Sequence, residues 1–242
     1  MKNKLPIADC RLPVEKPEAS RRWFQIANHK SKIVNGFTLV ELLVVIAIIS
    51  VVVAFTVPAY HAVKLNQYEH QTEVEMGQLQ AAIAGYKDTF GFYPPDSPQG
   101  PLLNQLYYEL EGTTLANGTY TTLDSADSVT TTALLSNLKV NGIVNCSKGT
   151  GEDAVQAKNF IHELRPNQTA AYNGVKLFVG SVGGPDPSYM PLAGFSSNPW
   201  RYVTQGTNNP GGYDLWIQLS YSGKKYLICN WSKQPQNNSP LP

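Results

Sequence analysis

A long apolar segment near the amino terminus dominates the pattern of hydrophobic and polar positions. The run from Phe37 to Val57 holds 21 residues, and Glu41 is the only ionisable one among them. At about 1.5 Å of rise per residue, such a helix reaches about 31 Å, enough to cross the hydrocarbon core of a bilayer. The pattern predicts a membrane-spanning helix with a carboxylate near its amino-terminal end. That carboxylate needs a partner, because charge is costly inside a membrane.

An amphipathic pattern follows this segment over residues 59–90. Core-type side chains recur there at alternating steps of three and four, which indicates a helix with one buried face. The stripe comprises Leu65, Tyr68, Thr72, Met76, Leu79, Ile83, Tyr86 and Phe90. We expect one long helix that ends before Gly91, with Pro58 able to kink it where it leaves the bilayer. A coiled-coil dimer is an alternative explanation of the stripe.

The carboxy-terminal part has the alternation of half-buried strands. Residues 213–220 alternate apolar and polar side chains, residues 200–203 form a candidate strand before them, and residues 225–230 form a third after a turn. The predicted fold class is therefore α+β. A long amino-terminal helix, transmembrane in its first half and amphipathic in its second, would pack on a small carboxy-terminal antiparallel β-sheet.

The middle of the chain, residues 91–199, gives weaker signals. Residues 102–110 are compatible with a short helix, and residues 176–179 with a short strand. Residues 113–132 are rich in Thr, Ser, Gly and Asn, so we expect a loop there. We interpret this middle as a variable insertion, and its sequence does not indicate a function.

Charge divides the chain at Gly36. The first 36 residues hold eight basic and three acidic side chains, a net charge of +5, whereas the whole chain carries +1 and the remainder therefore −4. Positively charged flanks stay in the cytoplasm, so residues 59–242 should lie on the opposite side of the membrane. The acidic remainder offers no basic patch, and no nucleic-acid partner is expected.

The segment around Gly36 carries a family resemblance. With a glycine before the aromatic Phe37, a glutamate at Glu41 and Pro58 after the apolar run, it resembles the cleavage and methylation segment of type IV pilins and type II secretion pseudopilins. The resemblance implies that a prepilin peptidase cuts between Gly36 and Phe37, removes the basic leader 1–36 and methylates the amine of Phe37. It also implies assembly into a filament through the helix that carries Glu41 and Pro58. An ordinary signal anchor is the alternative.

Later segments resemble the major pseudopilins in particular. They are a Tyr-Pro step at Tyr93-Pro94, the run Asn198-Pro199-Trp200, and the strand that begins near Asp214. The head would comprise an amphipathic helix (59–90), a variable middle (91–199), a β-sheet (200–231) and a polar tail (232–242).

This resemblance implies a structural subunit of a type II secretion pseudopilus, placed in the bacterial inner membrane with a periplasmic head, that drives protein export. Its partners would be copies of itself, the prepilin peptidase, the secretion or pilus assembly platform, minor pseudopilins and inner membrane lipid. One alternative is a type IV or competence pilin for adhesion, motility or DNA uptake. Another is a membrane-anchored periplasmic enzyme or binding module that does not polymerise.

The chain departs from the major pseudopilins where they bind calcium, in the loop before the last strand. Here residues 220–225 contain Lys224 and Lys225 and no carboxylate, and only Asp214 lies nearby. Calcium takes six to eight oxygen ligands, so we expect no metal and no cofactor. The sequence also lacks His-Glu-x-x-His, Cys-x-x-Cys, Gly-x-Ser-x-Gly and phosphate-loop motifs, so we expect no catalytic residues and no enzyme.

Two cysteines remain after the leader, Cys146 and Cys229. The compartment outside the inner membrane permits disulfides. A bond between them would close a loop of about 80 residues and add about 4 kcal/mol by chain-entropy arguments. Two buried free thiols are the alternative, and the sequence does not decide between them.

Overall fold

The computed structural model describes residues 38–148, 155–184 and 190–237. The chain divides into two compact units between Val51 and Val52. Helix α1 (Leu39–Phe90) begins in the first unit and continues in the second, which holds all the other described elements. The predicted long helix is confirmed, and it continues through Pro58, even though a proline has no N–H to donate to the helix.

In the first unit, the described residues form the start of α1, and its side chains are exposed. Within the described part of the chain, α1 is the one helix long and apolar enough to cross a membrane. None of the side chains in that apolar window is buried by protein. This part of α1 therefore has the surface of a helix whose neighbours are lipid or other apolar helices.

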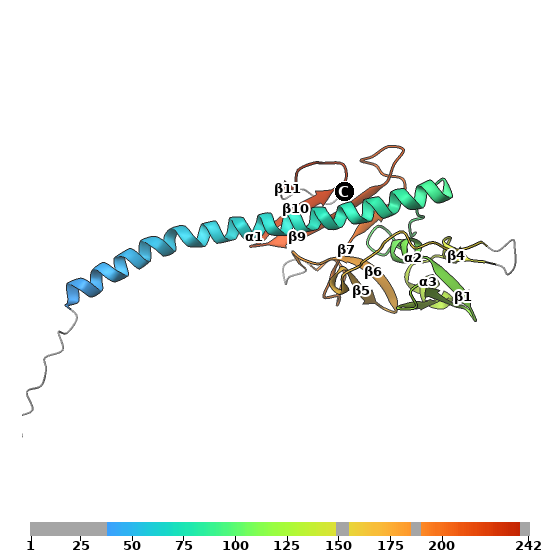
Figure 1. The fold of residues 1–242 in the computed structure, drawn as a ribbon, viewed down its shortest axis with the longest axis horizontal. Helices are drawn as coiled ribbons and strands as arrows, with labels where there is room; N and C mark the ends of the chain where they lie inside the picture. The colour runs from blue at the N-terminus through green and yellow to red at the C-terminus, as the bar shows by residue number, and fades with distance from the viewer. Residues whose placement is uncertain (1–37, 149–154, 185–189, 238–242) are drawn as a thin grey trace, which may run out of the picture. The chain divides into compact units, whose positions relative to one another are not determined.

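In the second unit, α1 packs against a carboxy-terminal sheet with strand order β11-β10-β9-β8 (Figure 1). Adjacent strands of this sheet pair antiparallel. They are β8 (Arg201–Val203), β9 (Asp214–Tyr221), β10 (Lys224–Cys229) and β11 (Gln236–Asn237). Ile83 and Tyr86 of α1 are fully buried in the same core as Leu215 and Ile217 of β9. The three strands predicted in this region are thus confirmed, and β11 is an addition at the edge.

The predicted stripe of α1 matches its buried face. Four of its eight members are buried, namely Thr72, Leu79, Ile83 and Tyr86. The other four are partly buried against the same core, namely Leu65, Tyr68, Met76 and Phe90. The stripe is therefore satisfied by the chain's own sheets, so the coiled-coil alternative is not needed to explain it.

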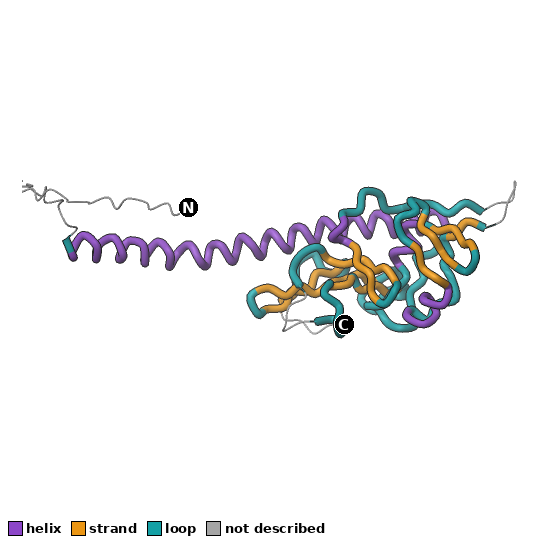
Figure 2. The backbone as a smooth tube through the Cα atoms, turned by 90° about the horizontal axis from the view of Figure 1, so that it is seen from below, coloured by secondary structure: helices purple, strands orange, loops and turns teal. Residues whose placement is uncertain are grey.

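The middle of the chain adds two more sheets beside α1 in the second unit (Figure 2). One has the order β3-β2-β1-β4, with β1 (Thr113–Ala116), β2 (Thr119–Thr122), β3 (Ser128–Thr130) and β4 (Cys146–Ser147). The other has the order β5-β6-β7, with β5 (Thr169–Tyr172), β6 (Val175–Gly180) and β7 (Asn198–Pro199). The same segment holds α2 (Leu106–Glu111), α3 (Thr131–Asn137) and the short helix η1 (Pro166–Gln168).

The loop predicted for residues 113–132 is wrong. This segment contains the antiparallel pair β1–β2 and the strand β3. Asn117 and Gly118 connect β1 and β2, and both have positive φ angles, 51° and 74°. An Asn-Gly pair with two positive φ angles is the preferred two-residue hairpin turn, because its twist matches that of the flanking strands. The threonines on either side are strand residues rather than loop residues.

Candidate functional site

The start of α1 carries the candidate assembly site, and its geometry is set by Thr38 and Glu41. The Glu41 carboxylate oxygen Oε2 accepts hydrogen bonds from the Thr38 backbone N–H at 2.9 Å and from the Thr38 hydroxyl at 2.8 Å. In return, the Thr38 hydroxyl oxygen accepts the Glu41 backbone N–H at 3.2 Å. This reciprocal arrangement is a capping box, which satisfies two of the N–H groups that a helix start leaves unpaired.

The capping box gives Glu41 a defined orientation at the helix start. Both contacts from Thr38 fall on one carboxylate oxygen, Oε2. The carboxylate also lies beside the positive end of the helix dipole, which favours a negative charge there. An incoming cation can therefore approach the other oxygen without breaking the cap.

Gly36 and Phe37, the predicted cleavage residues, lie outside the described residues, so the cleavage and methylation site stays a prediction. Pro58 lies inside α1, directly after the exposed apolar side chain of Val57. Glu41, the other predicted assembly residue, lies in the first turn of the same helix. Their roles in assembly are not tested by the fold.

The loop before β9 shows how the chain treats Asp214, the nearest candidate calcium ligand. The Asp214 side chain is buried and accepts four hydrogen bonds. Oδ2 accepts the backbone N–H and the side-chain amide of Asn208, both at 3.0 Å, and Oδ1 accepts those of Asn209 at 3.0 and 3.2 Å. Gly206 also lies close, since a Cβ atom there would overlap Oδ1. Four N–H donors would repel a cation, so this site does not fit calcium.

The sequence leaves open whether Cys146 and Cys229 form a disulfide or remain free thiols. Cys146 and Cys229 are both buried free thiols. Cys146 belongs to the main hydrophobic core, whereas Cys229 belongs to a separate cluster with Trp216 and Leu227. The structure therefore has the two buried thiols, not the disulfide.

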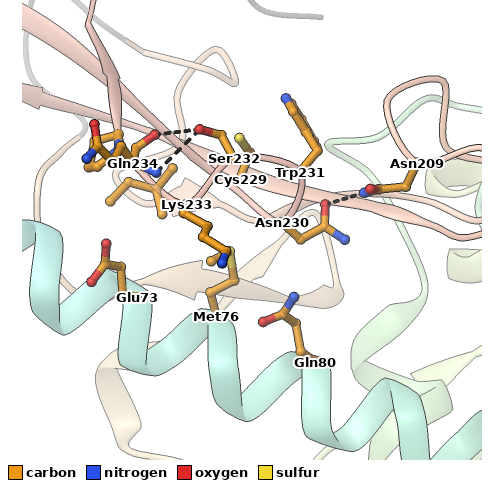
Figure 3. Close-up of a pocket in the computed structure, with 12 residues that line it drawn as sticks. Glu73, Met76, Gln80, Asn209, Cys229, Asn230, Trp231, Ser232, Lys233 and Gln234 are labelled. Carbon is orange, nitrogen blue, oxygen red and sulfur yellow. Dashed lines mark hydrogen bonds between the residues drawn. The ribbon is translucent and has the colours of Figure 1, made fainter.

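A groove of about 510 Å³ lies between α1 and the carboxy-terminal segment (Figure 3). Met76 and Gln80 line it from α1, and Cys229 and Trp231 line it from the other side. Burial raises the pKa of the Cys229 thiol, so the sulfur is protonated at neutral pH and is a poor nucleophile. Among the described residues, the groove brings no histidine to this thiol.

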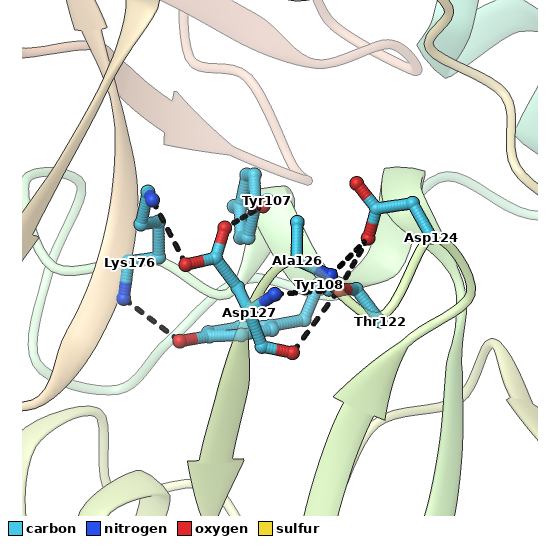
Figure 4. A network of polar contacts seen from close by, with 7 residues as sticks. All are labelled: Tyr107, Tyr108, Thr122, Asp124, Ala126, Asp127 and Lys176. Carbon is cyan, nitrogen blue, oxygen red and sulfur yellow. Dashed lines mark hydrogen bonds and ion pairs between the residues drawn. The ribbon is translucent and has the colours of Figure 1, made fainter. Parts of the chain in front are cut away.

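A polar network joins the middle sheets at Asp127 (Figure 4). Its carboxylate forms an ion pair with Lys176 at 2.9 Å and accepts the Tyr107 hydroxyl at 2.6 Å. Partial burial pushes the pKa of Asp127 up, but the hydrogen bonds from Lys176 and Tyr107 outweigh it and hold this pKa below its ordinary value. The network ties β6 to α2 and to the turn before β3, so its role is structural.

Glu111 of α2 faces the same region. Burial, together with the charges of Asp124 and Asp127, raises the pKa of Glu111 to about 7, although a hydrogen bond from Asn159 opposes the shift. Within the described residues, no group of three His, Cys, Asp or Glu side chains has the geometry to hold a metal ion.

Two contacts in these sites have local sequence signals but were not predicted above. Thr38-x-x-Glu41 is the capping-box signature at a helix start, and it was visible directly before the apolar run. The pair Asn208-Asn209 lies six and five residues before Asp214, within reach of a turn that folds back on it. Asx side chains in loops commonly hydrogen-bond nearby groups in this way.

Comparisons with known proteins find similarity to pilins, including at the amino-terminal segment that carries Glu41. Residues 32–57 match the family described as the prokaryotic N-terminal methylation motif. Over 98 residues the chain is 29% identical to the type IV major pilin protein PilE1 of Neisseria gonorrhoeae, a match that covers 39% of this chain and 46% of that pilin. The match thus spans less than half the length of this relative. No solved structure matches the chain.

Proposed function

We propose that this chain, whose motif and pilin similarity support a place in the type IV pilin and pseudopilin family, is a membrane-anchored subunit that polymerises through α1. The fold supports this proposal, because a long amino-terminal helix with an exposed apolar half precedes antiparallel sheets in the pilin manner. The observation that carries it is the Thr38–Glu41 cap. It places a carboxylate, oriented and held on one oxygen only, at the start of an otherwise apolar helix.

The proposed assembly step is an ion pair between subunits. After cleavage at Gly36, the methylated amine of Phe37 is still cationic near neutral pH and needs a partner among apolar helices. Glu41 of a neighbouring subunit supplies one. Because the Thr38 contacts occupy Oε2, the amine approaches Oε1 and the cap survives. The pair then fixes the axial step between neighbouring subunits.

Three substitutions separate this ion pair from the cap itself. Glu41→Gln keeps a capping box, since glutamine serves at this position, but it removes the charge. Thr38→Ala removes the hydroxyl contacts of the cap and keeps the charge. Glu41→Val removes the charge and the carboxylate contacts of the cap. We expect Glu41→Gln and Glu41→Val to insert in the membrane, lose the leader and fail to assemble, while Thr38→Ala assembles.

The measurement is cross-linking of membrane fractions from cells that express each variant without the wild-type chain. Leader removal is followed in the same samples by mass, which shows that a variant defective in assembly was still processed. Normal polymer ladders from Glu41→Gln, combined with loss of ladders from Thr38→Ala, would show that the cap and not the charge is needed. That result would overturn the pairing argument.

Two kinds of filament are candidates. From the pseudopilin-like segments, we propose first a type II secretion pseudopilus that drives export of folded proteins, with the peptidase, the assembly platform and minor pseudopilins as partners. A type IV pilus is the second candidate. The pilin relative favours it, and so do the two extra sheets of the middle segment, which make a more elaborate head. Deletion of the gene separates them: loss of an exported enzyme from the medium supports the first, and loss of surface filaments supports the second.

A further inference from the structure

The turn between β9 and β10 lies beside α1, close to the point where the apolar segment ends. The Tyr221 hydroxyl is 3.2 Å from Nδ1 of His61, and the Tyr221 ring packs edge-on against Tyr68 at 5.4 Å. His61 follows Val57 by four residues, about 6 Å along a helix axis. In Figures 1 and 2, this hairpin forms one end of the carboxy-terminal sheet and lies alongside α1.

With the apolar segment of α1 in a bilayer, this position would fall in the headgroup layer. A bilayer is about 40–45 Å thick including its polar layers and about 30 Å without them, which leaves about 5–8 Å of headgroups on each side. If Val57 ends the membrane-embedded segment, His61 and the hairpin lie within this layer. Tyr60, with 60% of its surface exposed, lies at the same level. Tyrosines are enriched at this depth because their rings are amphipathic.

The side chains at this level are also cationic. Lys224 and Lys225 are exposed at the hairpin, and the ammonium of Lys64 lies over the ring of Tyr68 at 5.8 Å. The next acidic residue along α1 is Glu69, about 12 Å beyond His61 along the helix. The surface next to the membrane therefore combines exposed lysines with tyrosine rings, which is the chemistry that anionic headgroups attract.

We propose that the β9–β10 hairpin binds anionic phospholipid headgroups where α1 leaves the bilayer, with Lys224 contacting phosphate and Tyr60 and Tyr221 at the interface. Ser222 and Gly223, with φ angles of 51° and 74°, form the two-residue turn that presents Lys224. Through the His61–Tyr221 contact, the bound hairpin would hold the carboxy-terminal sheet against the membrane surface before assembly. The binding requires membrane anchoring but not polymerisation.

The test uses the full chain inserted in vesicles at low protein density, with a polarity-sensitive dye at Ser222→Cys in a Cys10→Ser background. Cys146 and Cys229 are buried and should stay unlabelled. Acrylamide quenching of the dye is compared between phosphatidylcholine vesicles and vesicles that also contain phosphatidylglycerol. We expect less quenching when the anionic lipid is present. Lys224→Gln should weaken this headgroup binding about fivefold, the equivalent of about 1 kcal/mol for one lysine at an anionic surface.

Lys233→Gln is the matched control. Lys233 is an exposed lysine that lines the groove, whose α1 residues run from Glu73 to Gln80, about 24–34 Å beyond Val57 along the helix. Its loss should therefore leave the quenching unchanged. Equal quenching in both kinds of vesicle would overturn the proposal. Protection that grows with protein density would instead show that the hairpin contacts a second copy. Either result would leave the pairing of Phe37 with Glu41 intact, because the measurement does not depend on assembly.

Discussion

The buried carboxylate of Asp214 holds the loop before β9 through hydrogen bonds, and replacing it measures how much they stabilise the head. Its four N–H donors come from the two asparagines, Asn208 and Asn209, and lie at 3.0–3.2 Å. In Asp214→Asn, one carboxylate oxygen becomes an NH2 group that faces two donors. Each hydrogen bond to a charged group contributes about 1.5–3 kcal/mol, so losing two should lower the free energy of unfolding by about 3–6 kcal/mol.

The assay is thermal unfolding of the detergent-solubilised chain. For a domain of about 200 residues, each kcal/mol shifts Tm by about 2–4 °C, so the expected drop is about 6–24 °C. Asp88→Asn is the matched control, because Asp88 is an exposed carboxylate on α1 and its loss should change stability by less than about 0.5 kcal/mol. A chelator should leave the wild-type Tm unchanged, since Asp214 presents its oxygens to N–H donors.

The chelator arm is sensitive enough to refute this reasoning. A ligand present at a hundred times its Kd stabilises the folded state by about 2.7 kcal/mol, which corresponds to a shift of about 5–11 °C in Tm. A fall of several degrees on chelation would show that oxygens from elsewhere complete a cation site at this loop. An unchanged Tm for Asp214→Asn would show that the four hydrogen bonds contribute little.

Two further predictions concern proton binding by the head and processing of the leader. Because burial raises the pKa of Glu111 from about 4.5 to about 7, the folded state binds a proton that the unfolded state has released, and the free energy of unfolding should fall as pH rises from about 4.5 to 7. Glu111→Gln should remove this part of the slope in denaturant titrations, and identical slopes for the two proteins would contradict the assignment. Mass spectrometry of the membrane-extracted chain should find an amino terminus at methylated Phe37, and Gly36→Glu should block the cut. An intact leader in the wild-type chain, or a start beyond Ala59, would rule out the pilin-type processing.

Periodic segments of the chain could be predicted from the sequence because their signal is repeated many times. The stripe of α1 has eight members, and each is buried or partly buried. Strand β9 places Leu215, Ile217 and Leu219 in the main core, as the alternation predicts. Its other face is buried as well, with Trp216 in the second cluster, so the strand is not half-exposed as predicted. One side chain that departs from such a pattern leaves the other members in place, so the helix or strand is still predicted correctly.

The middle segment was harder because its elements are short and depend on contacts far away in the chain. Two Asn-Gly pairs, Asn117-Gly118 and Asn173-Gly174, connect adjacent strands and have positive φ angles throughout. An Asn-Gly pair is the strongest local signal for a hairpin turn, whereas the polar composition around these pairs predicts a loop. The composition was given more weight than the two pairs. The parallel pairing of β1 with β4, in contrast, has no local signal, since it joins Thr113 to Cys146.

The carboxylates of this chain differ in what satisfies them, and that difference indicates where assembly acts. Asp214 is buried with four N–H donors. Glu109 is buried too, and it accepts the backbone N–H groups of Val144 and Asn145 at 2.8 and 2.9 Å. In both, each oxygen is engaged by the folded chain, so an external cation would have to displace those donors. Glu41 is exposed, and Thr38 contacts only one of its oxygens. If apolar helices came together around Glu41, its carboxylate would need a positive charge from outside its own chain. The amine that cleavage after Gly36 would release is suited to supply it.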